Sequence, residues 1–154
     1  MSVTEETEET CPVRRTLDVM GDRWSFLIVR DAFDGLTRFG EFIDNLGIAR
    51  NILADRLRRL TEAGILETVL PDDGGSYAQY RLTASGRALF PVLVSLRQWG
   101  EDHCFERGER HSTLVERDSG RRLPRMQPLS QDGRALEGGD TTVRKPRPAG
   151  AATR

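Results

Sequence analysis

The strongest constraint on this chain is a pair of short amphipathic segments joined by a tight turn. Apolar residues recur at spacings of three and four over residues 38–45 and again over 49–63, which predicts two α-helices. Only Leu46-Gly47-Ile48 separates them, and Gly64 supplies a stop for the second. Two helices joined in this way predict a helix-turn-helix.

The hydrophobic period then changes from helical to extended. Residues 65–70 and 76–82 are predicted strands, and Pro71-Asp72-Asp73-Gly74-Gly75 between them predicts a hairpin. A hairpin directly behind the second helix is the wing of a winged helix-turn-helix. The fold class is therefore α+β, mainly α.

Further helices are predicted on both sides of this unit. They are expected over residues 13–20, over 23–33 behind an Asp22 cap, and from a Thr83 cap to about Cys104, with Pro91 kinking the last one. Their apolar positions are Val13, Leu17 and Met20, then Trp24, Leu27 and Ile28, then Leu89, Val92, Leu93, Leu96 and Trp99. On the last helix such a stripe favours core and dimer interface over the lining of a ligand cavity.

Charge and composition change along the chain. Residues 1–10 carry four Glu and no base, whereas residues 121–154 carry eight bases and three acids. Weak turns are predicted at 118–120 and 131–133. The expected parts are a disordered acidic arm (1–10), a winged-helix domain (11–104), a small strand-rich extension (105–136) and a disordered basic tail (137–154).

Composition and missing motifs exclude several classes of protein. The longest run without a charged residue, 88–96, is far shorter than the roughly 20 apolar residues of a bilayer span, and no basic-then-apolar leader opens the chain. We therefore expect a cytoplasmic protein with no membrane partner. With two cysteines, no Cys-x-x-Cys and no nucleotide or hydrolase signature, neither an enzyme nor a cofactor is expected. The spacing of His103, Cys104 and His111 matches no standard metal site.

The second helix of the pair is expected to present a polar face. With Leu53, Leu57 and Leu60 turned to the core, a rotation of about 100° per residue carries polar side chains to the opposite side. The outward residues are Asn51, Asp55, Arg58, Arg59 and Glu62, with Arg50 free at the N-terminal end. Charge alone fits a solvated surface equally well, but the position between a tight turn and a hairpin favours DNA.

The chemistry of these side chains suits the major groove of double-stranded DNA. Arginine is bidentate to guanine, asparagine pairs with adenine, and aspartate accepts from the cytosine amine. We expect Arg50, Asn51 and Asp55 to read bases, because they lie toward the helix N-terminus. Arg58 and Arg59, farther along, are expected to contact phosphates.

The order of motifs along the chain resembles one regulator family. These motifs are Cys11-Pro12-Val13, Leu17, Gly21-Asp22-Arg23-Trp24, Arg38-Phe39-x-Glu41, Gly47-Ile48, Leu53-x3-Leu57-x2-Leu60-x3-Gly64, Tyr80-x-Leu82-Thr83-x2-Gly86 and Trp99. Over about residues 11–104 the chain looks like the HxlR-type helix-turn-helix regulators. The resemblance implies a homodimeric winged-helix transcription factor, in which the first and last helices form the dimer and two recognition helices meet successive major grooves.

The chain departs from that family pattern at two places. Ala49 stands where the family usually has Ser or Thr, so the second helix of the pair lacks a side-chain cap. The wing tip is acidic, which phosphate would repel, so weak wing binding is expected. Arg81 is the basic residue nearest the wing tip. It joins Arg38 as a further candidate for DNA contact.

Cys11 stands where many HxlR-type proteins keep a redox-sensing cysteine. The resemblance implies that an electrophile or oxidant forms a thiol adduct or an intersubunit disulfide there. A helix N-terminus and the nearby Arg14 and Arg15 favour a thiolate, but the Glu-rich arm opposes it. The alternative role of Cys11 is that of a small buried hydrophobic residue.

These observations favour a sequence-specific transcriptional regulator that binds a pseudo-palindromic operator as a homodimer. Cys11 is the candidate through which an oxidant or electrophile changes its occupancy. The alternative is a winged-helix module that binds a ligand or another protein and has no specific DNA binding.

Overall fold

The computed structural model describes residues 10–146, so most of the expected acidic arm and residues 147–154 of the expected basic tail lie outside the described residues. The chain forms two compact units. The first is Pro12–Leu93, and the second comprises Thr10, Cys11 and the described residues from Val94 onward. No helix in the described part of the chain is both long and apolar enough to cross a membrane.

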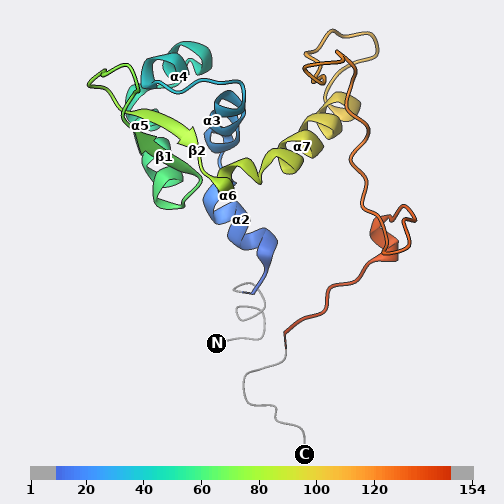
Figure 1. The fold of residues 1–154 in the computed structure, drawn as a ribbon. Helices are drawn as coiled ribbons and strands as arrows, with labels where there is room; N and C mark the ends of the chain where they lie inside the picture. Colours follow the sequence, from blue (N-terminus) through green and yellow to red (C-terminus); the bar gives the residue numbers. More distant parts are fainter. Residues whose placement is uncertain (1–9, 147–154) are drawn as a thin grey trace, which may run out of the picture. The chain divides into compact units, whose positions relative to one another are not determined.

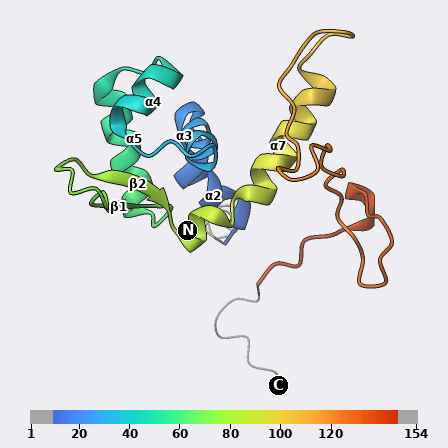
Figure 2. The same ribbon diagram turned by 45° about the horizontal axis from the view of Figure 1, so that its top comes forward.

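The first unit is a winged helix-turn-helix (Figure 1). Its elements are α2 (Pro12–Met20), α3 (Arg23–Phe33), α4 (Phe39–Leu46), α5 (Arg50–Glu62), β1 (Leu66–Val69), β2 (Gln79–Leu82), α6 (Ala84–Arg87) and the start of α7 (Phe90–His103). The strands pair antiparallel from Leu66↔Leu82 to Val69↔Gln79. In both views the two-stranded wing lies beside α5, against which β1 packs, while β2 packs against α3 (Figure 2). The predicted mainly helical winged fold is confirmed.

The core of this unit lies where α3, α4 and α5 meet. Ile28 and Val29 of α3 and Phe42 of α4 are fully buried, and Leu53, Leu57 and Leu60 bury the inward face of α5 as predicted. Packing of this kind fixes which face of α5 remains exposed. The polar side chains of α5 therefore point away from the core.

The prediction of one kinked helix after the wing is wrong, because the segment forms two helices. Thr83 caps α6 as expected, since its hydroxyl oxygen accepts the N–H of Gly86 at 3.0 Å. The helix ends at Arg87, and α7 begins anew at Phe90 with Pro91 in its first turn. Proline is tolerated there because the first N–H groups of a helix have no intrahelical acceptor.

Two outer helices bury less than their apolar spacing predicts. On α2 only Met20 is buried, while Val13 and Leu17 are 66% and 54% exposed. On the part of α7 in the second unit, Val94 is the buried residue, and Trp99 is 62% exposed. Periodicity predicts that a face will be covered, but it does not identify whether another part of the same protomer covers it.

The expected strand-rich extension is not present, because residues 105–136 contain only two isolated bridges among the described residues. These bridges pair Val115 with Arg122 and Leu129 with Ala135. The two predicted turns do form, with Gly120 and Gly133 at positive φ. Prolines at 124 and 128 lack the N–H that a longer ladder needs, which favours irregular backbone. Within the expected tail, Gly138–Asp140 forms one 3₁₀ turn.

Candidate nucleic-acid interface

A carboxylate fixes the start of α4, and backbone conformation fixes the turn from α4 into α5. Glu41 accepts the N–H groups of Thr37 and Arg38, each at 2.9 Å, and these bonds lower the pKa of the Glu41 carboxyl. Gly47 ends α4 at φ 61°, in the left-handed region, and donates its N–H to Ile43 at 2.9 Å. Ala49 precedes α5 without a side-chain cap, as predicted.

The N-terminal end of α5 presents to solvent two of the three residues expected to read bases. Arg50 and Asn51 are both exposed. The Arg50 guanidinium lies 5.8 Å from the centroid of the Phe39 ring, a cation–π arrangement that links the start of α5 to the start of α4. The turn between the helices therefore helps to place Arg50.

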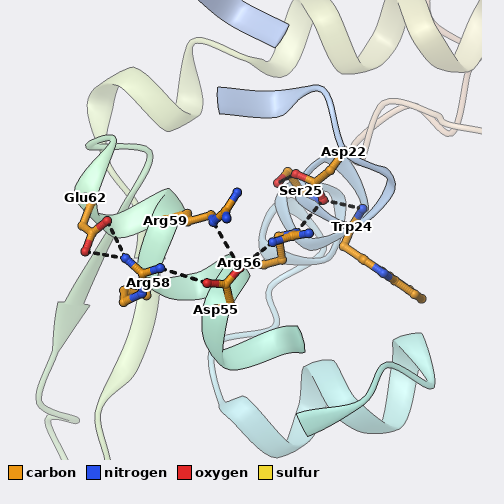
Figure 3. Close-up of polar contacts among 8 residues, drawn as sticks. All are labelled: Asp22, Trp24, Ser25, Asp55, Arg56, Arg58, Arg59 and Glu62. Atoms are coloured by element: carbon orange, nitrogen blue, oxygen red, sulfur yellow. Dashed lines mark hydrogen bonds and ion pairs between the residues drawn. The ribbon is translucent and has the colours of Figure 1, made fainter. Parts of the chain in front are cut away.

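Asp55 is the centre of an arginine cluster on α5 (Figure 3). Its carboxylate lies 2.5 Å from Arg56, 2.9 Å from Arg58 and 3.1 Å from Arg59. The hydrogen bond from Arg58 and the nearby guanidinium charges lower the pKa of the Asp55 carboxyl. Arg58 also donates to both carboxylate oxygens of Glu62 at 2.8 Å. Asp55 therefore already has three intramolecular partners.

Arg56 connects this cluster to the beginning of α3. Its Nε donates to Asp22 at 2.9 Å, and both side chains are less than one-third exposed. Asp22 also caps α3, accepting from the N–H groups of Trp24 and Ser25 at 3.0 and 3.1 Å and from the Ser25 hydroxyl. Partial burial acts to raise the pKa of Asp22, but the Ser25 and Trp24 hydrogen bonds and the Arg56 charge outweigh it and lower the pKa.

The buried carboxylate of Asp31 was not predicted from the sequence. Asp31 is 1% exposed and accepts from the Arg30 guanidinium at 2.7 Å and from Asn45 at 2.8 Å. The contact with Asn45 holds the end of α4 against α3. Its signal in the sequence is spacing, because Asp31 follows buried Ile28 by three residues and so falls on the inward face of α3.

Acidic residues of the wing pair with the two arginines that were named as further candidates for DNA contact. Arg38 lies 3.6 Å from Asp73, and Arg81 lies 3.8 Å from Asp72. Asp72 and Asp73, the wing-tip acids, are solvent-exposed. The contact with Arg38 joins the tip of the wing to the start of the helix-turn-helix, whereas the contact with Arg81 lies within the wing. Tyr80 strengthens the same junction by donating its N–H to the carbonyl of Thr37 at 2.8 Å.

The two cysteines are free thiols in the second unit. Cys11 is half-buried and directly precedes α2, whereas Cys104 is exposed just after α7. Trp99 stacks near His103 with the ring centroids 5.1 Å apart. Within residues 10–146 no group of three or more His, Cys, Asp or Glu residues could hold a metal ion.

Comparison with known families decides what kind of helix-turn-helix this is. Residues 19–108 match the model of the HxlR-like helix-turn-helix. The chain belongs to this family. Its members in the comparisons are transcriptional regulators and not enzymes. The matched region contains α3 to α7 and therefore every α5 and wing residue described above.

Individual relatives match different fractions of the chain. An uncharacterized HTH-type transcriptional regulator of Mycobacterium tuberculosis, Rv3095, is 45% identical over 91 residues, which is 59% of this chain and 58% of Rv3095. The match thus spans little more than half the length of this curated relative. The crystal structure of a candidate transcription factor, PA1607, is 56% identical and superposes with a TM-score of 0.86, covering 92% of this chain and 99% of PA1607.

Two further relatives are a redox regulator in its oxidized form and a regulator with a bound quinone. The oxidized form of the redox regulator HypR is 34% identical with a TM-score of 0.55, covering 60% of this chain and 97% of HypR. Quinone-bound YodB of Bacillus subtilis is 29% identical with a TM-score of 0.52, covering 60% of this chain and 99% of YodB.

Proposed function

We propose that this HxlR-family regulator binds a specific DNA sequence through α5 as a homodimer. The observation that carries the proposal is the orientation of α5. Its leucines are buried, so Arg50 and Asn51 at its N-terminal end face solvent together with the arginine cluster. A recognition helix that enters the major groove by its N-terminal residues requires this arrangement.

The contacts on α5 suggest a division of roles among its polar residues. Arg50 and Asn51 are proposed to read base edges. Arg58 and Arg59, 56% and 61% exposed in their side chains, are proposed to contact phosphates. Because the Asp55 carboxylate already has three guanidinium partners, we assign it the positioning of Arg58 and Arg59 in addition to the base contact expected of it.

The homodimer is supported by apolar side chains that the protomer leaves uncovered on α2 and α7. Val13 and Leu17 are more than half exposed on α2, as is Trp99 on α7, and Leu96 is 49% exposed. Exposed apolar faces of this kind mark protein–protein contacts. A two-fold dimer would present two copies of α5, which fits a pseudo-palindromic site with half-sites about one helical turn apart.

Cys11 is proposed as the residue through which an oxidant or an electrophile changes DNA occupancy. It is a free, half-buried thiol at the start of α2, one of the two helices proposed to form the dimer. The redox regulator HypR and quinone-bound YodB support this chemistry by analogy. Modification at the dimer helix would change the separation of the two α5 helices, so both half-sites could no longer be met together.

The test is selection of binding sites from random duplex DNA by the purified full-length protein. The selection is run with reductant and again after diamide or a quinone, with wild type, Cys11→Ser and, as the matched control, Cys104→Ser. We expect a two-fold-symmetric site under reducing conditions, lost on oxidation in wild type and Cys104→Ser but retained in Cys11→Ser. A chain that enriches no site in either condition would instead be the winged-helix interaction module.

A further inference from the structure

The second unit contains a cavity that the proposed DNA interface does not use. Its volume is about 220 Å³, and every lining residue lies between Val94 and Arg125. One wall is formed by α7, and the other by the irregular segments around Thr113 and Leu123. The extension after α7 thus forms one side of a partly open site that α7 alone would lack.

Hydrogen bonds fix the two walls of this cavity to each other. Arg97 of α7 donates to the carbonyl and hydroxyl oxygens of Ser112 at 3.1 and 2.9 Å. Gln98, one residue on, donates to the carbonyl of Pro124 at 3.0 Å and accepts the N–H of Met126 at 2.8 Å. The cavity is therefore held open by contacts that need no ligand.

The cavity combines an apolar base with a surplus of positive charge. Val94 is 2% exposed, and Leu114 and Leu123 are half-buried around it. Each lining carboxylate faces an arginine, because Glu101 lies 4.0 Å from Arg97 and Asp102 pairs with Arg125. These contacts leave the third lining arginine, Arg122, as the cation without a carboxylate partner.

Arg122 forms no ion pair with any residue in the described range 10–146. Its one side-chain hydrogen bond, to the Thr113 hydroxyl, is long at 3.5 Å. A guanidinium offers two parallel donors that match the two oxygens of a carboxylate. The guanidinium of Arg122 is therefore available to bind an anion at this cavity.

We propose that this cavity binds a small monocarboxylate with an apolar ring, its carboxylate on Arg122 and its ring over Val94. Size supports a single ring, because a cavity of about 150 Å³ already holds benzene and drug-sized pockets begin near 300 Å³. The lining also favours a singly charged ligand, since Arg122 is the one lining arginine without a carboxylate partner. This site is independent of the proposed DNA contacts.

Benzoate is the probe, measured by chemical-shift titration of the full-length ¹⁵N-labelled protein at neutral pH. We expect saturable shifts with benzoate and at least ten-fold weaker binding of neutral benzamide, which has the same ring. Acetate, which carries the charge without the ring, should also bind at least ten-fold more weakly. Ten-fold corresponds to about 1.4 kcal/mol.

Two variants test the assignment of Arg122. Arg122→Gln should weaken benzoate binding at least ten-fold. Arg122→Lys keeps the positive charge but not the two parallel donors of the guanidinium, so its affinity for benzoate should lie between those of Arg122→Gln and wild type. Arg121→Gln is the matched control, because it removes the same charge one residue away from the cavity lining. Equal affinity of benzoate for Arg122→Gln and wild type, equal binding of benzoate and benzamide, or shifts that never saturate would each overturn the proposal.

Discussion

Replacing Asp22 should destabilise the winged-helix unit more than any ordinary surface change, because one carboxylate performs two tasks. It caps α3 by accepting hydrogen bonds from two backbone N–H groups, and it also accepts a hydrogen bond from Arg56 of α5. Loss of an N-cap costs about 0.5–2 kcal/mol, and loss of a hydrogen bond to a charged group about 1.5–3 kcal/mol. We expect Asp22→Ala to lower the free energy of unfolding by about 2–5 kcal/mol.

Asp22→Asn separates the two tasks, since asparagine caps a helix as well as aspartate does. It should retain the cap, lose the charge opposite Arg56, and cost about 1–2 kcal/mol. The pKa of Asp22 is lowered in the folded protein from its ordinary 3.8, so the carboxylate contributes stability above that pH. The advantage of wild type over Asp22→Asn should therefore begin to fall below about pH 3.8 and disappear once the pH has passed through the lower pKa of Asp22 in the folded protein.

Urea denaturation at fixed protein concentration measures these differences, because the apparent stability of the proposed dimer would depend on concentration. Asp18→Ala is the matched control, since its partly screened pair with Arg14 at 3.4 Å should leave stability within about 0.5 kcal/mol of wild type. A double-mutant cycle with Arg56→Met should give a coupling of at least about 0.5 kcal/mol. A change below about 0.5 kcal/mol for Asp22→Ala, or no coupling to Arg56, would refute the reasoning.

Three further predictions concern the DNA interface and the turn. Arg50→Ala should weaken binding to the selected site by about 1–3 kcal/mol and relax the base preference. Arg59→Ala should mainly reduce the dependence of DNA affinity on salt concentration. Equal losses of affinity on specific and random DNA for both variants would contradict these roles. Replacing both wing-tip acids with Asn should strengthen binding to random DNA at low salt, measured by fluorescence anisotropy, because it frees Arg38 and Arg81 for phosphate. Gly47→Ala should cost about 1–2 kcal/mol in urea denaturation through its positive φ, while Gly40→Ala, at an open helical position, should not destabilise.

Local signals predicted the elements of the first unit well. The α3 helix runs over Arg23–Phe33, the predicted range, because a strong cap and a clear apolar period act within a few residues of each other. The inward face of α5 was equally predictable, since Leu53, Leu57 and Leu60 repeat at helical spacing. In both cases the deciding interactions are close in sequence.

The contacts that organise the candidate site could not be predicted in the same way. The hydrogen bond between Arg56 and Asp22 joins residues 34 apart, and it depends on how α5 crosses α3. The wing-tip acids could be recognised as a local charge, but their pairing with Arg38 and Arg81 depends on how the hairpin folds back. Asp55 differs from these cases, because Arg58 and Arg59 follow it by three and four residues, a helical spacing at which opposite charges pair, so these ion pairs are local.

Acids among the arginines give the proposed interface a bias toward specific sites. Any contact of Arg38 or Arg81 with phosphate must replace a contact with a wing-tip acid, and this cost applies to every DNA sequence alike. Arg50 has no acid partner among the described residues, so its base contacts carry no such cost. In the proposed interface the acids would therefore reduce nonspecific affinity and leave the proposed base-reading contacts intact, which would raise the ratio of specific to nonspecific binding.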